Sequence, residues 1–195
     1  MQKKQNIRTV IPINEAITKG YLQLNICGAN DPKVFNEVIY QDGVHFGKCM
    51  AIGLTSKIDS LIFLKLKCGT ILIPINDSVQ TMLFTHDVEF PLYPKMGYWT
   101  RLYAMCSQIH DYPPTIETTF HIGEMANDSL LKLSKYLEMS FNQNMIGQHA
   151  VWFITDHVTL KDLKPYGADS LSFFKTTAIL NSVFIKSGVK TEKGS

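Results

Sequence analysis

The sequence of 195 residues lacks every cysteine pattern that would indicate a zinc ribbon or a thioredoxin-like site. Its four cysteines are widely separated, and no two of them form a Cys-x-x-Cys pair. Isolated cysteines usually behave as small buried hydrophobic residues. We therefore expect buried thiols at Cys27, Cys49, Cys68 and Cys106.

Charge and long apolar runs are also scarce. Charged residues make up 18% of the chain, the formal net charge is +2, and the lysines are scattered except near the two ends. Nucleic-acid binding needs a basic stripe that neutralises phosphates, so this class is excluded. The richest apolar run, Leu61 to Leu64, meets Lys65 at once, whereas a membrane span needs ~20 apolar residues. The sequence therefore predicts a soluble chain without a membrane span.

A secretory signal is not recognisable either. Residues 9–15 are too short and too interrupted to form the apolar region of such a signal. The sequence therefore predicts the cytoplasm if Met1 is the natural start, and it leaves export open if Met1 is not.

Signatures of catalysis are missing as well. The sequence has no Gly-x-Ser-x-Gly elbow and no glycine-rich phosphate loop. The sequence contains the residue types of a hydrolytic triad, but nothing in it indicates that they lie together. The candidates are Cys106, His149 or His157, and Asp156. These absences favour binding over catalysis, and no cofactor is expected.

The order of the predicted elements indicates the fold class. Hydrophobic residues supply 45% of the chain, which lets one domain of this length bury a core without a metal or a disulfide. Strands come first and helices last, so the class is α+β. We expect an antiparallel β-sandwich or partly open barrel over about 20–122, packed against helices over about 127–187. The predicted parts are an N-terminal arm (1–20), a β-rich part (21–123), a helical part (124–188) and a flexible tail (189–195).

Alternating apolar residues identify the strand faces. Ile62, Leu64 and Leu66 fall on one face of a strand predicted within residues 60–67. Pro74 lies in the next predicted strand, residues 70–75, and has no N–H to give to a ladder. We therefore expect that strand at a sheet edge, or Pro74 at an unpaired position.

Capping residues mark the helices of the C-terminal part. Asn127 offers an N-cap for the first helix, and Thr159 with Asp162 approximates a capping box. Asp169 is expected to cap a long last helix that ends near Gly188. The apolar residues of that last helix include Leu171, Phe174 and Ala178.

Residues 148–156 combine an amide, an imidazole and an indole in an apolar segment. Gln148 and Trp152 occupy positions i and i+4 of a predicted helix, so they share a face. A buried tryptophan is first of all a packing residue. We therefore predict that Trp152 is buried between the helical part and the β core, and that Gln148 bonds a backbone or side-chain group there.

The run from Gln148 to Trp152, Gln-His-Ala-Val-Trp, resembles the Gln-x-Ala-(Ile/Val)-Trp helix motif in the thioester domains of Gram-positive surface adhesins. Those domains join a β-rich part to a helical part and carry an internal Cys–Gln thioester that captures host targets covalently. The resemblance implies a reactive cysteine upstream, which Cys106 matches in order, and an acyl-donating glutamine downstream. Here no glutamine follows Gln148, Gly147 stands where the family has threonine, and Met105 precedes the cysteine.

A structural zinc site is a further hypothesis. His45 and Cys49 are four residues apart, as are Cys106 and His110, and such pairs share a face on a strand. If the two strands were neighbours, the four side chains could form a Cys₂His₂ tetrahedron. Four residues along a straight strand span ~13 Å, so the strands would have to bend.

Aromatic residues gather around three chain breakers, Pro91, Pro94 and Gly97. Aromatic side chains in such a loop are typical of a partner contact. The alternative is a lid over the open end of the β core. The candidate contact residues are Phe90, Tyr93, Tyr98 and Trp99.

The sequence as a whole predicts a non-catalytic binding or interaction module whose partner is another protein. The resemblance adds the setting of an accessory subunit in a bacterial surface or secretion assembly. Two alternatives stay open, namely covalent capture through Cys106 and a structural zinc protein.

Overall fold

Short apolar strands form two sheets in the computed structural model, which describes residues 8–29 and 45–184. The strands are β1 (Val10–Pro12), β2 (Leu22–Gly28), β3 (Met50–Ser56), β4 (Ile62–Leu66), β5 (Thr70–Pro74), β6 (Met82–Phe84), β7 (Val88–Leu92), β8 (Gly97–Leu102), β9 (Ala104–Cys106) and β10 (Phe120–Met125). One sheet has the order β8-β3-β2-β10-β5-β6-β9 and the other β1-β4-β7. Neighbouring strands are antiparallel except for β1 and β4.

One hydrophobic core lies between the two sheets. Ile62, Leu64 and Leu66 of β4 are buried on the same face, as their alternation predicts. They belong to one cluster with Ile52 and Leu72 of the larger sheet. Within the described residues neither sheet closes on itself, so the architecture is two open sheets and not a barrel. The predicted α+β class is confirmed.

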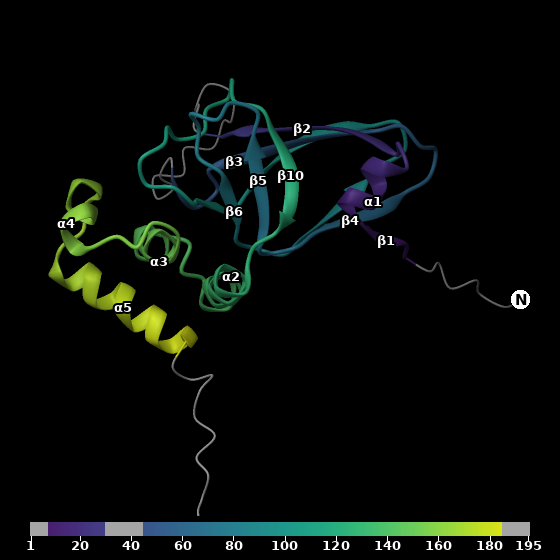
Figure 1. Cartoon of the computed structure of the whole chain (residues 1–195). Helices are drawn as coiled ribbons and strands as arrows, with labels where there is room; N and C mark the ends of the chain where they lie inside the picture. Colours follow the sequence, from purple (N-terminus) through teal and green to yellow (C-terminus); the bar gives the residue numbers. More distant parts are fainter. Residues whose placement is uncertain (1–7, 30–44, 185–195) are drawn as a thin grey trace, which may run out of the picture.

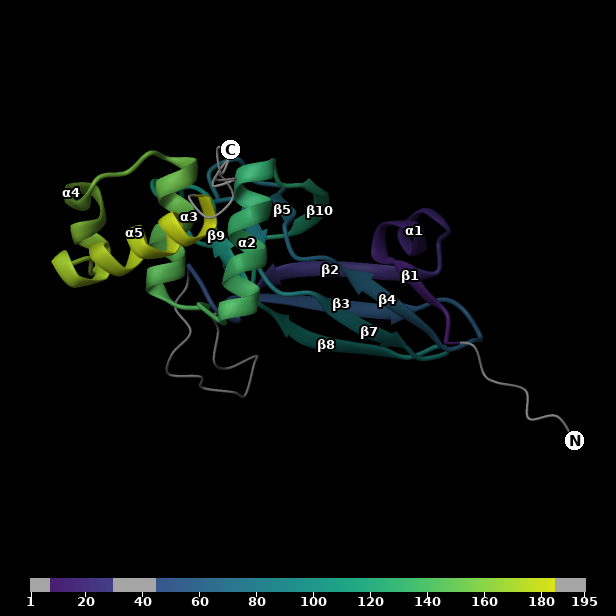
Figure 2. The ribbon, with the colours of Figure 1, turned by 90° about the horizontal axis from the view of Figure 1, so that it is seen from below.

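Helices pack against both ends of the sheets. They are α1 (Ile13–Thr18), α2 (Asp128–Ser140), α3 (Met145–Thr155), α4 (Leu160–Leu163), the 3₁₀ turn η1 (Lys164–Tyr166) and α5 (Ser170–Phe184). Figures 1 and 2 show α2 to α5 gathered at one end of the strands and α1 at the other. In the part of the chain that the structure describes, no helix has the length and apolar character to cross a membrane.

The predicted caps of the C-terminal helices are confirmed. Asn127 and Asp169 each accept the N–H three residues further on, at 3.0 Å and 2.7 Å. The N–H of Thr159 donates to Asp162 Oδ2 at 2.8 Å. These side chains replace the intrahelical partners that backbone groups lack at helix starts.

The N-terminal arm is a prediction that the structure corrects. Residues 10–18 form β1, which runs parallel to β4, and α1. Ile13 and Ala16 of α1 are 2% and 0% exposed, so this segment belongs to the core. A three-residue strand and a six-residue helix are too short to show a periodic pattern. Residues 1–7 of the predicted arm lie outside the described residues.

Three prolines lie within strands, namely Pro12 at the end of β1, Pro74 in β5 and Pro91 in β7. β5 is internal to its sheet, but its ladder with β6 covers only Ile71 and Leu72, so Pro74 lies beyond it. On the β6 side of β5, Pro74 therefore has no ladder partner, which is the second of the two predicted alternatives. Pro91, predicted to break the chain, lies inside β7, which is an edge strand and so tolerates a residue without an N–H.

The apolar residues named for the last helix, α5, lie on its exposed side. Leu171 and Phe174 are 59% and 70% exposed, and Ala178 is exposed too. Apolar residues occur around most of this helix, so periodicity alone does not choose a face. The predicted end near Gly188 and the tail fall outside the described residues. The residues that α5 buries are Thr176, Ile179 and Leu180.

Candidate functional site

The first turn of α3 fixes the position of the motif residues. The Asn144 side chain accepts hydrogen bonds from the N–H groups of Ile146 at 2.9 Å and Gly147 at 3.2 Å. A Cβ on Gly147 would lie 2.1 Å from the carbonyl oxygen of Asn142 and 2.8 Å from Met105 Cε. The chain therefore needs glycine where the adhesin family has threonine, because α3 begins too close to the end of α2 for a side chain.

Gln148 joins α3 to β9 through the backbone of Cys106. Its Oε1 accepts the Cys106 N–H at 2.9 Å, and its Nε2 donates to the Cys106 carbonyl at 2.7 Å. Both residues are fully buried. We call this two-bond contact an amide clasp. The prediction that Gln148 bonds a group at this joint is confirmed.

A second amide clasp lies one strand away and was not predicted. Gln143 accepts the Thr85 hydroxyl at 2.6 Å and donates to the Thr85 carbonyl at 3.0 Å. Gln143 precedes α3 and Thr85 follows β6, so the contact joins residues 58 positions apart. Only the tertiary pairing reveals it, since a lone glutamine before a helix carries no sequence signal.

Trp152 fills the space between α3 and the β core and is 0% exposed. Its ring lies 4.9 Å from the ring of Tyr166, 5.5 Å from that of His45 and 6.2 Å from that of His149, measured between centroids. It belongs to the same hydrophobic cluster as the strands of both sheets. The predicted burial of Trp152 at the joint is confirmed.

The thiol of Cys106 contacts His45 and Met82. Its Sγ lies 3.3 Å from His45 Nδ1 and 3.6 Å from Met82 Sδ. Burial, with a smaller contribution from Cys49, raises the pKa of the Cys106 thiol well above its ordinary value, and burial lowers the pKa of His45. The pair is therefore a neutral thiol and a neutral imidazole, not the activated thiolate of a cysteine nucleophile.

His149 is fully buried beside Trp152. Burial lowers the pKa of His149, and the nearby Tyr166 backbone offsets this only in part. Neither ring nitrogen makes a hydrogen bond of normal geometry to a described residue. Because a charged imidazole would be costly in this place, the folded protein holds His149 neutral.

The buried His149 predicts that acid destabilises the fold. The unfolded chain takes up a proton on this residue below pH about 6.5, whereas the folded chain does not until its lower pKa is reached. The free energy of unfolding is therefore expected to be highest above that pH and to fall below it, by up to about 1.4 kcal/mol per pH unit. Urea unfolding from pH 7.5 to 5 measures the slope. The slope should become less steep in His149→Phe, where the lowered pKa of His45 still contributes, and should keep its full steepness in the control His121→Gln, an exposed histidine on β10. An unchanged slope in His149→Phe would contradict this origin.

The other predicted chemical residues do not converge. His45, and not His149 or His157, contacts Cys106, while Asp156 ends α3. His110 is exposed, and it makes a small contribution to the lowered pKa of Asp162 in α4, which comes mainly from the hydrogen bonds with Thr159. In residues 8–29 and 45–184 no three His, Cys, Asp or Glu side chains form a group that could hold a metal ion. The predicted Cys₂His₂ set is therefore not assembled, although His45 and Cys106 do meet.

The cysteine environments agree with the expectation of buried thiols. All four cysteine side chains are buried. The Cys49 thiol donates to the Ala104 carbonyl at 3.3 Å, and burial raises the pKa of Cys68 to about 12. High pKa values make these thiols poor nucleophiles.

The predicted aromatic contact residues are divided by the structure. Phe90 is 3% exposed and lies in the core, so its place in a contact surface is wrong. Tyr98 is half-buried and its hydroxyl donates to the Pro91 carbonyl at 2.8 Å. Trp99 and Tyr93 are 50% and 45% exposed. About half of each of these two side chains is therefore exposed.

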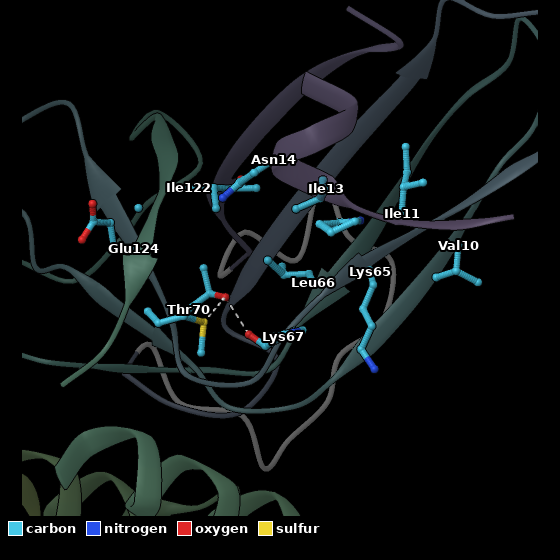
Figure 3. A pocket seen from close by; sticks show the side chains of 13 residues that line it. Val10, Ile11, Ile13, Asn14, Lys65, Leu66, Lys67, Thr70, Ile122 and Glu124 are labelled. Atoms are coloured by element: carbon cyan, nitrogen blue, oxygen red, sulfur yellow. Dashed lines mark hydrogen bonds between the residues drawn. The ribbon is translucent and has the colours of Figure 1, made fainter. Parts of the chain in front are cut away.

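A groove separates β1 and α1 from β10, with a volume of about 290 Å³. Figure 3 shows Ile122 and Ile13 in the upper part of the view, with Thr70 and Leu66 below them, and all four residues line the groove. The Thr70 hydroxyl donates to the Lys67 carbonyl at 2.7 Å. The lining is mainly apolar and brings no acid–base pair or nucleophile together. The groove could therefore bind an apolar group, but it has no side chains arranged for catalysis.

Comparison with protein-family models, with curated proteins and with solved structures found no match for this chain.

Proposed function

We propose that this chain is a non-catalytic binding module and that its partner is another protein. The observation that carries the proposal is the half-exposed indole of Trp99. The ring packs against Gly53 of β3, where a Cβ would lie 2.7 Å from two of its carbons. A large rigid side chain that packs on a glycine gives contact area at little cost in conformational entropy.

The surroundings of Trp99 have the composition of an interface. Asn25, Gly53 and Trp99 are cross-strand partners on β2, β3 and β8, and they form one row on the outer face of the sheet. Gln23 and Thr55 of the next row share that face. These polar side chains are exposed and uncharged. Arg101, two residues from Trp99 on β8, is a charged residue on the same face, and arginine is enriched at protein interfaces together with aromatic residues.

The chemistry of the Cys106 site favours binding over covalent capture. The Gln148 amide is engaged at both of its polar atoms by the Cys106 backbone. The Cys106 thiol is buried and protonated at neutral pH, and its contacts are an imidazole and a thioether. Gln148 of the Gln-His-Ala-Val-Trp motif thus holds α3 against β9. An accessory subunit of a bacterial surface or secretion assembly is the setting that the adhesin resemblance suggests.

Trp99→Ala tests the proposal. A partner isolated with the wild-type chain and then purified is titrated against wild type and variant by calorimetry. Trp99→Ala is expected to weaken the Kd about 30-fold or more, corresponding to about 2 kcal/mol. Met139→Ala, which removes an 81% exposed side chain on α2, serves as the control and should leave the Kd unchanged. Equal binding by Trp99→Ala and wild type would refute this surface.

The intact mass of the same purified protein separates binding from covalent capture. We expect the full mass of the chain, because no acylated thiol is proposed. A mass lower by that of one ammonia would instead establish an internal thioester and overturn the non-catalytic proposal, provided that an amine nucleophile opens it by adding its own mass and that the loss is absent in Cys106→Ser.

A further inference from the structure

Three side chains that can bind a metal ion, His45, Met82 and Cys106, lie in one row at the end of the larger sheet. Met82 of β6 is the cross-strand partner of Cys106 of β9. On the other side of β9, the Cys106 N–H donates to the His45 carbonyl at 2.9 Å, so His45 flanks Cys106 there. The flanking bonds, Ser107 to Thr81 at 3.0 Å and Thr85 to Tyr103 at 3.0 Å, make Met82 and Cys106 a non-hydrogen-bonded pair, in which side chains approach most closely.

Two donor–donor distances in this row, from Cys106 to His45 and from Cys106 to Met82, are close to those around a bound metal ion. A tetrahedral ion with metal–sulfur bonds of about 2.3 Å and metal–nitrogen bonds of about 2.0 Å separates nitrogen from sulfur by about 3.5 Å and two sulfurs by about 3.8 Å. The separations here are 3.3 Å between His45 Nδ1 and Cys106 Sγ, and 3.6 Å between Cys106 Sγ and Met82 Sδ. Shifts of about 0.2 Å would bring both pairs to coordination distance.

The donor types select the metal. Thiolate and thioether sulfurs are soft ligands and suit copper(I), and imidazole suits copper as well. No carboxylate belongs to the group, whereas calcium and magnesium require oxygen ligands. We propose that Cys106, His45 and Met82 form a binding site for copper(I), with the cysteine as thiolate when the ion is bound.

The surroundings hold the donors in place. Gln148 fixes the Cys106 backbone, and the rings of Trp152 and Tyr166 make T-shaped contacts with the His45 ring, with 5.5 Å and 6.1 Å between centroids. Such support orients metal ligands before the ion arrives. Met82 and Cys106 are fully buried, whereas His45 is half-buried and gives the ion a route from the surface.

The test is copper(I) binding by the full chain under anaerobic, reducing conditions, in competition with bicinchoninate as a coloured copper(I) chelator. One equivalent is expected to bind. Cys106→Ser should weaken binding by about 100-fold or more and Met82→Leu by about tenfold. Cys68→Ser, which alters a buried thiol elsewhere in the fold, is the matched control and should bind as wild type does. Met82→Leu conserves volume and keeps the test valid if Cys106→Ser fails to fold.

X-ray absorption of the copper(I) complex gives an independent readout. We expect one nitrogen and two sulfur neighbours, with one sulfur lost in Met82→Leu. The proposal is overturned if the chain retains no copper(I), if Met82→Leu changes neither the affinity nor the sulfur count, or if Cys68→Ser abolishes binding. Tetrahedral cobalt(II) binding with the same dependence on Cys106 would assign the site to a divalent metal and would also overturn the copper(I) proposal.

Discussion

Replacing Trp152 with alanine is expected to lower the free energy of unfolding by about 4 kcal/mol. The side chain is 0% exposed and contacts the rings of Tyr166, His45 and His149. Its loss removes apolar contact and leaves a cavity between α3 and the β core, which the rigid strands cannot fill. Because the whole stability of a domain is about 5–15 kcal/mol, the variant should lie close to unfolding.

Urea unfolding followed by circular dichroism measures this loss. Trp152→Phe preserves part of the packing and should lose less than Trp152→Ala. Trp99→Ala is the matched control, because the same indole is removed from a side chain that is 50% exposed, and its loss should stay below about 1 kcal/mol. Similar losses for Trp152→Ala and Trp99→Ala would show that Trp152 is not the packing centre of the joint.

Replacing Gln148 with leucine is expected to lower the free energy of unfolding by about 3 kcal/mol. Leucine fills a similar volume but cannot donate to the buried Cys106 carbonyl, which accepts from Gln148 Nε2 at 2.7 Å. In this variant the Cys106 N–H still donates to the His45 carbonyl at 2.9 Å. Most of the lost stability therefore comes from the Cys106 carbonyl, which is left without a donor. Gln148→Glu loses the same donor and adds a buried charge, and it should be at least as destabilising at neutral pH.

Thermal and urea unfolding of the glutamine variants provide the measurement. Gln23→Leu on the exposed face of β2 is the control and should change stability by no more than about 0.5 kcal/mol. Gln143→Leu removes the other amide clasp and should also be destabilising. If Gln148→Leu proved as stable as Gln23→Leu, the amide clasp would contribute packing alone.

Features encoded by neighbouring residues could be predicted from the sequence. The alternation of Ile62, Leu64 and Leu66 is repeated in their burial, and Asn127 caps its helix as expected. Trp152 was predictable because a large apolar residue on a helix beside a β-rich part has one favourable place, the joint between them. These inferences need no knowledge of which strands pair.

The contacts at Cys106 could not be predicted, because they depend on strand pairing. His45 and Cys106 are 61 residues apart, and Gln143 and Thr85 are 58 apart. The four-residue spacings that suggested a zinc site included His110 among the candidate ligands and did not include Met82. The pairing of Met82 with Cys106 depends on the register between two strands, which the spacing of residues in the sequence does not reveal. The exposure of Phe174 was missed for a related reason, because α5 is apolar on more than one side.

The end of the larger sheet shows how a protein can hide a strand edge without another strand. β9 is the last strand of its sheet, and an unprotected edge there would offer N–H and carbonyl groups to a second molecule. Instead Gly47, His45 and the Gln148 side chain occupy these groups, and α3 lies over them. The helical part thus protects the β9 edge of the sheet from pairing with another molecule. Substitutions that weaken the packing of α3 on β9 should therefore reduce solubility as well as stability.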